Sequence, residues 1–147
     1  MKIAVMQPYL FPYLGYYQLI HACDKFIFYD DVNYIKQGWI NRNRILMNGK
    51  DNMFTMSLKD ASSFKLINEI EINQGNEKLF KTITQAYSKA PYYNDVFPLI
   101  QKIFNEANEI KKISTIAQLS VVRVFEYLGI SRIFEVSSQV YSHTKHL

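Results

Sequence analysis

Two short apolar segments near the N-terminus, residues 2–6 and 25–29, constrain the fold more than any other feature of this chain. The first stops before Pro8 and suits a buried strand, because proline lacks the amide donor that a strand needs to continue. Between the two segments, a loop with two prolines and a glycine leads into a short helix predicted over 16–23. Strand, helix and strand in this order predict a βαβ unit with parallel strands and a right-handed crossover.

The middle of the chain carries the pattern of a β-hairpin. Side chains alternate between the two sides of an extended strand from 39 to 47, and the Asn48-Gly49 pair that follows is typical of a type I′ turn. We therefore predict that this strand folds back onto residues 52–58. A further strand is expected within 64–72.

The second half of the chain has the periodicity of helices. Apolar residues recur at helical spacing in three segments, predicted over 76–91 with Asn76 as cap, over 94–107 with Asn94 as cap, and over 113–128 with Gly129 as stop. Residues 130–136 predict a last strand, and residues 137–147 predict a mobile terminus. Together the elements predict one α/β domain over 1–147. It is expected to be three-layer and Rossmann-like, with a mostly parallel sheet, an appended β-hairpin and a helical second half.

Composition limits the class of partner. The net charge of +4 favours an anionic partner, but the positive charge is spread along the chain without a basic tail, which disfavours nucleic acid. Cys23 is the only cysteine, so no internal disulfide forms and a reducing compartment is expected. Because no apolar run has the length of a membrane span and no signal-peptide pattern is visible, we expect a cytoplasmic protein.

The loop before the first helix is a candidate binding site. Backbone N–H groups at a helix N-terminus are unpaired and the helix dipole is positive there, so the position suits a phosphate or a carboxylate. Gly15 permits close packing or a positive φ. The alternative is that the tyrosines and prolines simply pack an irregular loop. Besides Gly15, the first binding set around this turn comprises Gln7, Tyr9, Tyr13, Tyr16 and Gln18.

Two candidate catalytic carboxylates, Asp30 and Asp31, follow the second predicted strand. A carboxylate at the carboxyl end of a central strand can bind a sugar hydroxyl, orient a cation or take a proton from an amine nucleophile. Since neighbouring residues of a strand point to opposite faces, we expect at most one of the two to face the site. The alternative role is to cap the following turn.

Basic, amide and aromatic side chains follow in the next segment. Arg42 and Arg44 share one face of the predicted hairpin strand, and with the preceding lysine they can hold a diphosphate through charge-assisted hydrogen bonds. Trp39 can stack on a base or sugar ring. The alternative is the solvent-facing polar side of a half-buried strand. This second binding set comprises Lys36, Trp39, Asn41, Arg42, Asn43 and Arg44.

The residues alone predict an anion-binding α/β domain and no named reaction. The sequence contains no P-loop, no Gly-x-Ser-x-Gly, no zincin helix and no intact Gly-x-Gly-x-x-Gly. We therefore predict no metal site and no cofactor.

Several long motifs resemble one protein family. They are MQPYLFPYLGYYQLI over 6–20, DKF over 24–26, YDDV over 29–32, YIK over 34–36 and GWINRNRI over 38–45, with weaker similarity up to Ser137 and Ser138. The chain with these motifs resembles the WbqC-like family of bacterial proteins. This family is associated with gene clusters for O-antigen and other surface polysaccharides, part of the lipopolysaccharide machinery. Its members usually run further, with another α/β portion, so we expect a short member of the family.

The resemblance implies a transferase of surface-polysaccharide biosynthesis. Such an enzyme would move an acyl or aminoacyl group, for example glycyl, onto the amine of a nucleotide-linked amino sugar. In that scheme the basic side chains of 36–44 bind the diphosphate, Trp39 stacks, and Asp30 or Asp31 deprotonates or positions the amine. The first binding set orients sugar hydroxyls, and the acyl donor is left open.

Other functions compete with the transferase. One is a noncatalytic nucleotide- or sugar-binding module whose site is completed by a second copy or by a partner protein. A weaker resemblance to nucleotidyltransferases with a Gly-His signature at a helix start suggests an enzyme of that type, but Tyr16 stands where the histidine would be. A phenol with an ordinary pKa near 10 cannot take the role of that histidine, so this second resemblance extends to the fold and not to the reaction. RNA binding is the remaining alternative.

Overall fold

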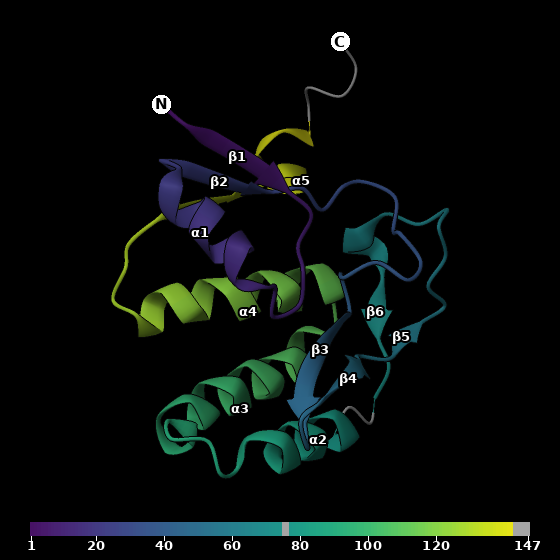
Figure 1. The fold of residues 1–147 in the computed structure, drawn as a ribbon. Helices are drawn as coiled ribbons and strands as arrows, with labels where there is room; N and C mark the ends of the chain where they lie inside the picture. The colour runs from purple at the N-terminus through teal and green to yellow at the C-terminus, as the bar shows by residue number, and fades with distance from the viewer. Residues whose placement is uncertain (75–76, 143–147) are drawn as a thin grey trace.

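A three-stranded parallel sheet joins the two ends of the chain. The computed structural model describes residues 1–74 and 77–142. Strand β2 (Lys25–Phe28) is central and pairs in parallel with β1 (Ile3–Met6) on one side and β7 (Ile133–Val136) on the other (Figure 1). Helix α1 (Leu14–Ala22) connects β1 to β2, so the predicted βαβ unit is confirmed.

Two helices pack on the same face of this sheet. The strand order advances in one direction, and successive right-handed crossovers in one direction leave their helices on one side. Tyr16 of α1 and Phe125 of α4 (Ile113–Tyr127) accordingly join Phe26 and Phe28 of β2 in one apolar cluster. The predicted α/β class is confirmed. The layers are stacked as sheet, then α1 with α4, then α2 with α3 (Figure 1), whereas a Rossmann domain has helices on both faces of its sheet.

The opposite face of the sheet is only partly covered. Ile3, Val5 and Ile133 are each about half exposed there. Helix α5 (Ser137–Val140) lies at one end of the sheet (Figure 1), and the hydroxyl of Tyr141 beside it donates to the Glu135 carboxylate at 2.7 Å.

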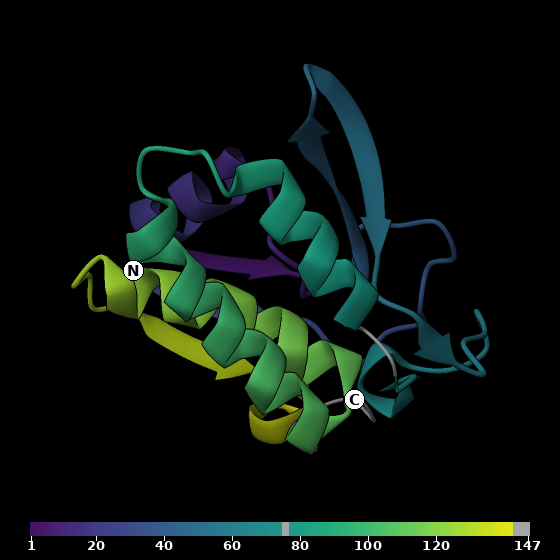
Figure 2. The same cartoon turned by 90° about the horizontal axis from the view of Figure 1, so that it is seen from below.

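The predicted hairpin is confirmed. Strand β3 (Arg42–Met47) pairs antiparallel with β4 (Lys50–Thr55), and both turn residues have the positive φ of a type I′ turn, 52° at Asn48 and 73° at Gly49. The paired segments are shorter than expected, because residues 39–41 form bends and Leu58 turns away to join another pair. Figure 2 shows the hairpin standing beside α2.

Short elements link the hairpin to the helices. Strand β5 (Leu58–Lys59) pairs antiparallel with β6 (Glu71–Ile72), and a 3-10 helix, η1 (Ile67–Glu69), precedes β6. The strand expected within 64–72 is therefore the two-residue β6.

Three helices follow as predicted. They are α2 (Glu77–Tyr87), α3 (Tyr93–Ile110) and α4. The proposed Asn94 cap is wrong, because the amides of Asp95 and Val96 bond to the Tyr92 carbonyl and the cap is Tyr92, two residues earlier. The proposed Asn76 cap lies outside the described residues. Gly129 follows α4 with a φ of 67°, which confirms the predicted stop.

The chain remains ordered after β7 over residues 137–142. The prediction of a mobile terminus is wrong over residues 137–142, where α5 packs its first residue, Ser137, into the interior at 5% exposed. Residues 143–147 of that predicted terminus lie outside the described residues.

Candidate functional site

Two aspartates meet the start of α5 at the carboxyl end of β2. Asp30 and Asp31 are 3% and 7% exposed. Ser138 donates twice to Asp30, through its amide to Oδ1 at 3.1 Å and through its hydroxyl to Oδ2 at 3.0 Å. The Ser137 hydroxyl lies 3.2 Å from Asp30 Oδ1 and also donates to Asp31 Oδ1, while it accepts the Asp30 amide at 3.2 Å. The two carboxylates therefore converge on one serine hydroxyl.

This convergence differs from the expectation that at most one aspartate faces the site. The alternation of side chains holds within a strand, but β2 ends at Phe28 and both aspartates lie in the bend after it. The backbone there also serves as an anchor, since the Asp30 carbonyl accepts the Asn68 amide at 3.1 Å. Both carboxylates consequently point toward the same neighbour.

A serine pair that the sequence analysis did not select as site residues completes this arrangement. Ser137 and Ser138 are more than a hundred residues from Asp30 along the chain. Their only signal in the sequence is that the family resemblance extends to them. A hydroxyl has one proton, so Ser137 donates to one of the two carboxylates at a time.

The first binding set divides into buried and exposed members. The Tyr16 hydroxyl donates to the Gln7 carbonyl at 2.8 Å, and burial raises the pKa of this phenol, which therefore stays a neutral donor. Tyr9 packs on Tyr16 with ring centroids 5.7 Å apart. Tyr13 is 68% exposed. Its ring lies over Gly15, where a Cβ would collide with it, so the glycine makes room for this ring. Gly15 does not have a positive φ.

Gln18 lies apart from the carboxyl end of the sheet. It is exposed on α1 and lines an open groove between α1 and α4 with Tyr17 and His21. Gln18 stands in the middle of α1, and the groove that it lines contains neither aspartate.

Several side chains of the second binding set stabilise the loop that carries them. Arg42 donates from Nε to the Gly38 carbonyl at 3.0 Å and from Nη2 to the Gln37 carbonyl, and its guanidinium lies 5.9 Å from the Trp39 ring centroid. Asn41 is buried and fully engaged, because it accepts the Tyr34 hydroxyl at 2.9 Å and donates to a backbone carbonyl at 2.8 Å.

Lys36 and Arg44 are the exposed cations of this set. Lys36 lies in the loop, and Arg44 pairs at 2.8 Å with Asp51 across the hairpin. Both members of that pair are more than half exposed, and such a surface pair is weak enough to exchange for another anion.

The structure docks the two binding sets against each other. The Leu10 amide donates to the Ile40 carbonyl at 3.2 Å, and the Asn43 side-chain amide donates to the carbonyls of Leu10 and Phe11. Ser120 of α4 also accepts the Phe11 amide at 3.0 Å. Hydrogen bonds therefore join the loop after β1 to the segment that leads into the hairpin.

Within residues 1–74 and 77–142, no group of three or more histidine, cysteine, aspartate or glutamate side chains is arranged to hold a metal ion. In the same part of the chain, no helix combines the length and apolar character needed to cross a membrane.

Comparison with known proteins bears directly on these motifs. A model of the WbqC-like protein family matches residues 7–147. The chain belongs to the WbqC-like protein family. This WbqC-like chain is similar to an uncharacterized protein of Mycobacterium tuberculosis, Rv1507c, with 29% identity over 133 residues. The match covers 88% of the chain and 57% of the relative, so the chain spans little more than half the length of that protein. No solved structure matches.

Proposed function

We propose that this WbqC-like chain binds a nucleotide-linked amino sugar and accepts the proton released when an acyl or aminoacyl group, such as glycyl, is transferred to the sugar amine. The observation that carries the proposal is the convergence of Asp30 and Asp31 on Ser137 at the carboxyl end of the central strand. Open α/β sheets bind their ligands at this edge. Such a transfer would be a step in the biosynthesis of surface polysaccharides such as O-antigen.

Asp31 is the group to which we assign the proton. Asp30 receives two hydrogen bonds from Ser138, so we assign to Asp30 the positioning of α5 and of the shared Ser137 hydroxyl, and the proton to the other carboxylate of the pair. In the step itself, the amine nitrogen bonds to the acyl carbon and its proton passes to the Asp31 carboxylate. The bond from the acyl carbon to the leaving group of the donor, an activated ester or thioester, breaks.

Lys36 and Arg44 are the side chains that we assign to the diphosphate. Both are exposed cations, whereas Arg42 bonds to the carbonyls of its own loop and holds Trp39. A diphosphate competes well for Arg44, because its surface pair with Asp51 is screened by solvent.

The test separates binding from turnover. The parent chain and Asp31→Asn are titrated calorimetrically with nucleotide-linked amino sugars, and acyl transfer is then followed by mass spectrometry with thioester and aminoacyl-ester donors. We expect Asp31→Asn to bind as the parent does and to lose turnover by about a hundredfold or more, since a general base contributes that much. Asp60→Asn, which removes an exposed carboxylate elsewhere, is the matched control. Equal turnover in Asp31→Asn, or a parent that binds no nucleotide sugar, contradicts the proposal.

A noncatalytic binding module is the second candidate. The observation that favours it is the burial of both carboxylates, which already have partners inside the chain. This candidate predicts nucleotide-sugar binding with no product from any donor class until another polypeptide is added.

A further inference from the structure

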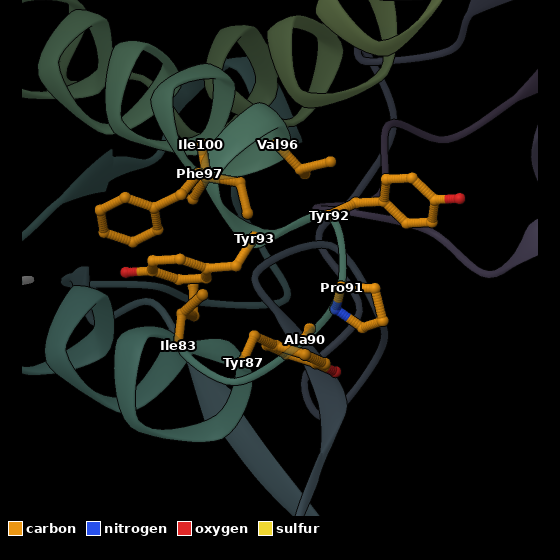
Figure 3. A pocket seen from close by; sticks show the side chains of 9 residues that line it. All are labelled: Ile83, Tyr87, Ala90, Pro91, Tyr92, Tyr93, Val96, Phe97 and Ile100. Carbon is orange, nitrogen blue, oxygen red and sulfur yellow. The ribbon is translucent and has the colours of Figure 1, made fainter.

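A second concave site lies between α2 and α3, in the layer farthest from the sheet (Figure 1). The cavity has a volume of about 280 Å³. Figure 3 shows aromatic side chains on both sides of it, with Tyr87 and Tyr92 on one side and Tyr93 and Phe97 on the other. Neither the aspartates nor the two binding sets line it, although a neighbouring hollow lined by Asn43 and Arg44 shares its Ile83, Tyr87 and Ile100 walls.

The walls of the cavity are held in place by ring packing. Tyr93 stacks on Phe97 with centroids 4.6 Å apart, and Phe80 supports Phe97 from behind at 4.8 Å. On the opposite side, the Tyr87 hydroxyl accepts the Leu46 amide of the hairpin at 3.4 Å. A cavity whose walls are fixed in this way is preformed, which is typical of small-molecule sites.

The lining determines which part of a ligand fits inside. Aliphatic side chains, among them Ile83 and Ile100, form the remaining surface, and the tyrosine hydroxyls lie at the outer ends of their rings, directed away from the hollow (Figure 3). A polar group placed there would lose its water without gaining a hydrogen bond, which is costly. The buried part of a ligand is therefore hydrocarbon.

The residues near the mouth of the cavity determine which chemical group suits the exposed end of the ligand. Tyr92 is 73% exposed, so the cavity opens to solvent beside it. Lys89 is exposed on the connection between α2 and α3, in the same short segment as the lining residues Tyr87 and Ala90, and it adds to a net charge of +4. Lys89 supplies a positive charge in the segment that borders the apolar hollow, which suits an anion that carries an apolar tail.

We propose that the cavity between α2 and α3 binds the alkyl chain of an amphiphile whose anionic head, a carboxylate or a phosphate monoester, lies at Lys89. The chain displaces water from the aromatic walls, and the head stays in solvent beside the ammonium group. Recognition by this site thus depends on chain length first and on head-group charge second.

Calorimetric titration of the parent chain with butanoate, hexanoate and octanoate tests whether the cavity binds the alkyl chain. Each methylene buried in the cavity should raise the affinity about fourfold. Methyl NMR locates the ligand, with shifts expected at Val96 and none at Ile45 of the neighbouring hollow or at Ile27 of the sheet. A flat chain-length series, or shifts spread equally to Ile45 or Ile27, overturns the proposal.

Ligands with different head groups test whether an anionic head group strengthens binding. Octanoate and octyl phosphate are compared with neutral octyl glucoside, and at least one anion should bind more tightly; the tighter anion identifies the head group. Lys89→Gln should weaken binding of that anion about threefold at low salt, whereas Lys59→Gln on β5 should not. Equal affinity for the anions and the glucoside overturns the assignment to an anionic amphiphile.

Filling the cavity gives an independent check. Ala90→Phe places a ring among the lining residues and should weaken octanoate binding at least tenfold, while Ala22→Phe on α1 should leave it unchanged. Melting temperatures establish that both variants are folded. If Ala90→Phe is folded and binds as the parent does, the ligand does not occupy this cavity.

Discussion

Tyr16 shows at the scale of one residue how the motif after β1 is held in shape. Its ring is buried in the sheet-side core and its hydroxyl holds the Gln7 carbonyl. The residue was predicted to bind substrate because it stands at a helix start; in the structure it is buried and packs against Tyr9. Its effect on any ligand would pass through the position of the loop.

The Tyr16→Phe variant removes that hydroxyl while keeping the ring. We expect a loss of about 1–2 kcal/mol in the free energy of unfolding, because the Gln7 carbonyl is left without its donor in a partly buried place. Tyr13→Phe removes the same group from an exposed ring and should change stability by much less. Urea denaturation measures both, and equal losses would contradict the assigned role of Tyr16.

For Asp30 and Asp31, the sequence pattern predicted the position in the fold but not the direction of the side chains. Their type and their place after an apolar strand were visible in the sequence, and the carboxyl end of β2 is where the structure has them. Which way each points was not predictable, because the bend that follows β2 depends on contacts with η1 and α5.

Among the elements, β2 and β7 are tied together by charges on the partly open face of the sheet. Lys25 pairs with Glu135, which also accepts the Tyr141 hydroxyl. The hydrogen bond from Lys25, followed by that from Tyr141, lowers the pKa of Glu135 below its usual value of 4.5, and the same pairing raises the pKa of Lys25. The lowered pKa means that the folded chain binds a proton at Glu135 less readily than the unfolded chain does.

This difference predicts a pH dependence of stability. The contribution of Glu135 is fully present above the pKa of its unfolded form and is lost as the pH falls through the lower pKa of the folded form. We expect Glu135→Gln to be less stable than the parent at pH 7 and the gap to shrink as the pH approaches 3. Urea denaturation across this range measures it, with the exposed Glu109→Gln as control. A gap that stays constant or widens toward low pH would refute the assignment.

Elements with a local signal were predicted well. The Asn48-Gly49 turn and the Gly129 stop need positive φ, which their own residue types favour. Helices α2, α3 and α4 follow from spacing that each segment carries by itself. The ends of the elements were less predictable, as at Asn94, because competing hydrogen bonds of the connecting turn decide where a helix starts.

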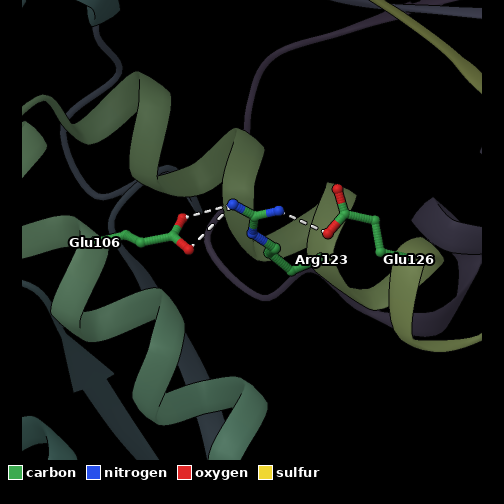
Figure 4. A network of polar contacts seen from close by, with 3 residues as sticks. All are labelled: Glu106, Arg123 and Glu126. Carbon is green, nitrogen blue, oxygen red and sulfur yellow. Dashed lines mark hydrogen bonds and ion pairs between the residues drawn. The ribbon is translucent and has the colours of Figure 1, made fainter.

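For the whole molecule, α4 is the helix that joins two apolar cores. Ile113 and Ile116 in its first half pack with the hairpin, α2 and α3, whereas Val121 and Phe125 in its second half pack with the sheet. Arg123 strengthens the contact of α4 with its neighbour. Figure 4 shows its guanidinium between Glu106 of α3 and Glu126 of α4, at 3.0 and 2.7 Å.

The two ion pairs of Arg123 should contribute differently to the free energy of unfolding. Glu106→Gln removes a charge that joins two helices at a site less than a quarter exposed, and we expect it to cost about 1–2 kcal/mol. Glu126→Gln breaks a pair within one helix whose glutamate is half exposed, and about 0.3–0.5 kcal/mol is expected. A double-mutant cycle with Arg123→Gln measures both couplings by denaturation. The joining role of Glu106 is disproved if the Glu126 coupling is the larger.

The class of the fold, the hairpin, the three long helices and the stretch of chain that holds the motifs were all predictable from the amino-acid sequence, because each depends on residue spacing or on a residue type that favours one local conformation. Three other features were not predictable in this way: α1 and α4 share one face of the sheet, Asn43 ties the hairpin to the loop after β1, and Ser137 contacts both aspartates. These contacts join segments far apart in the chain, so their geometry depends on how all the layers pack.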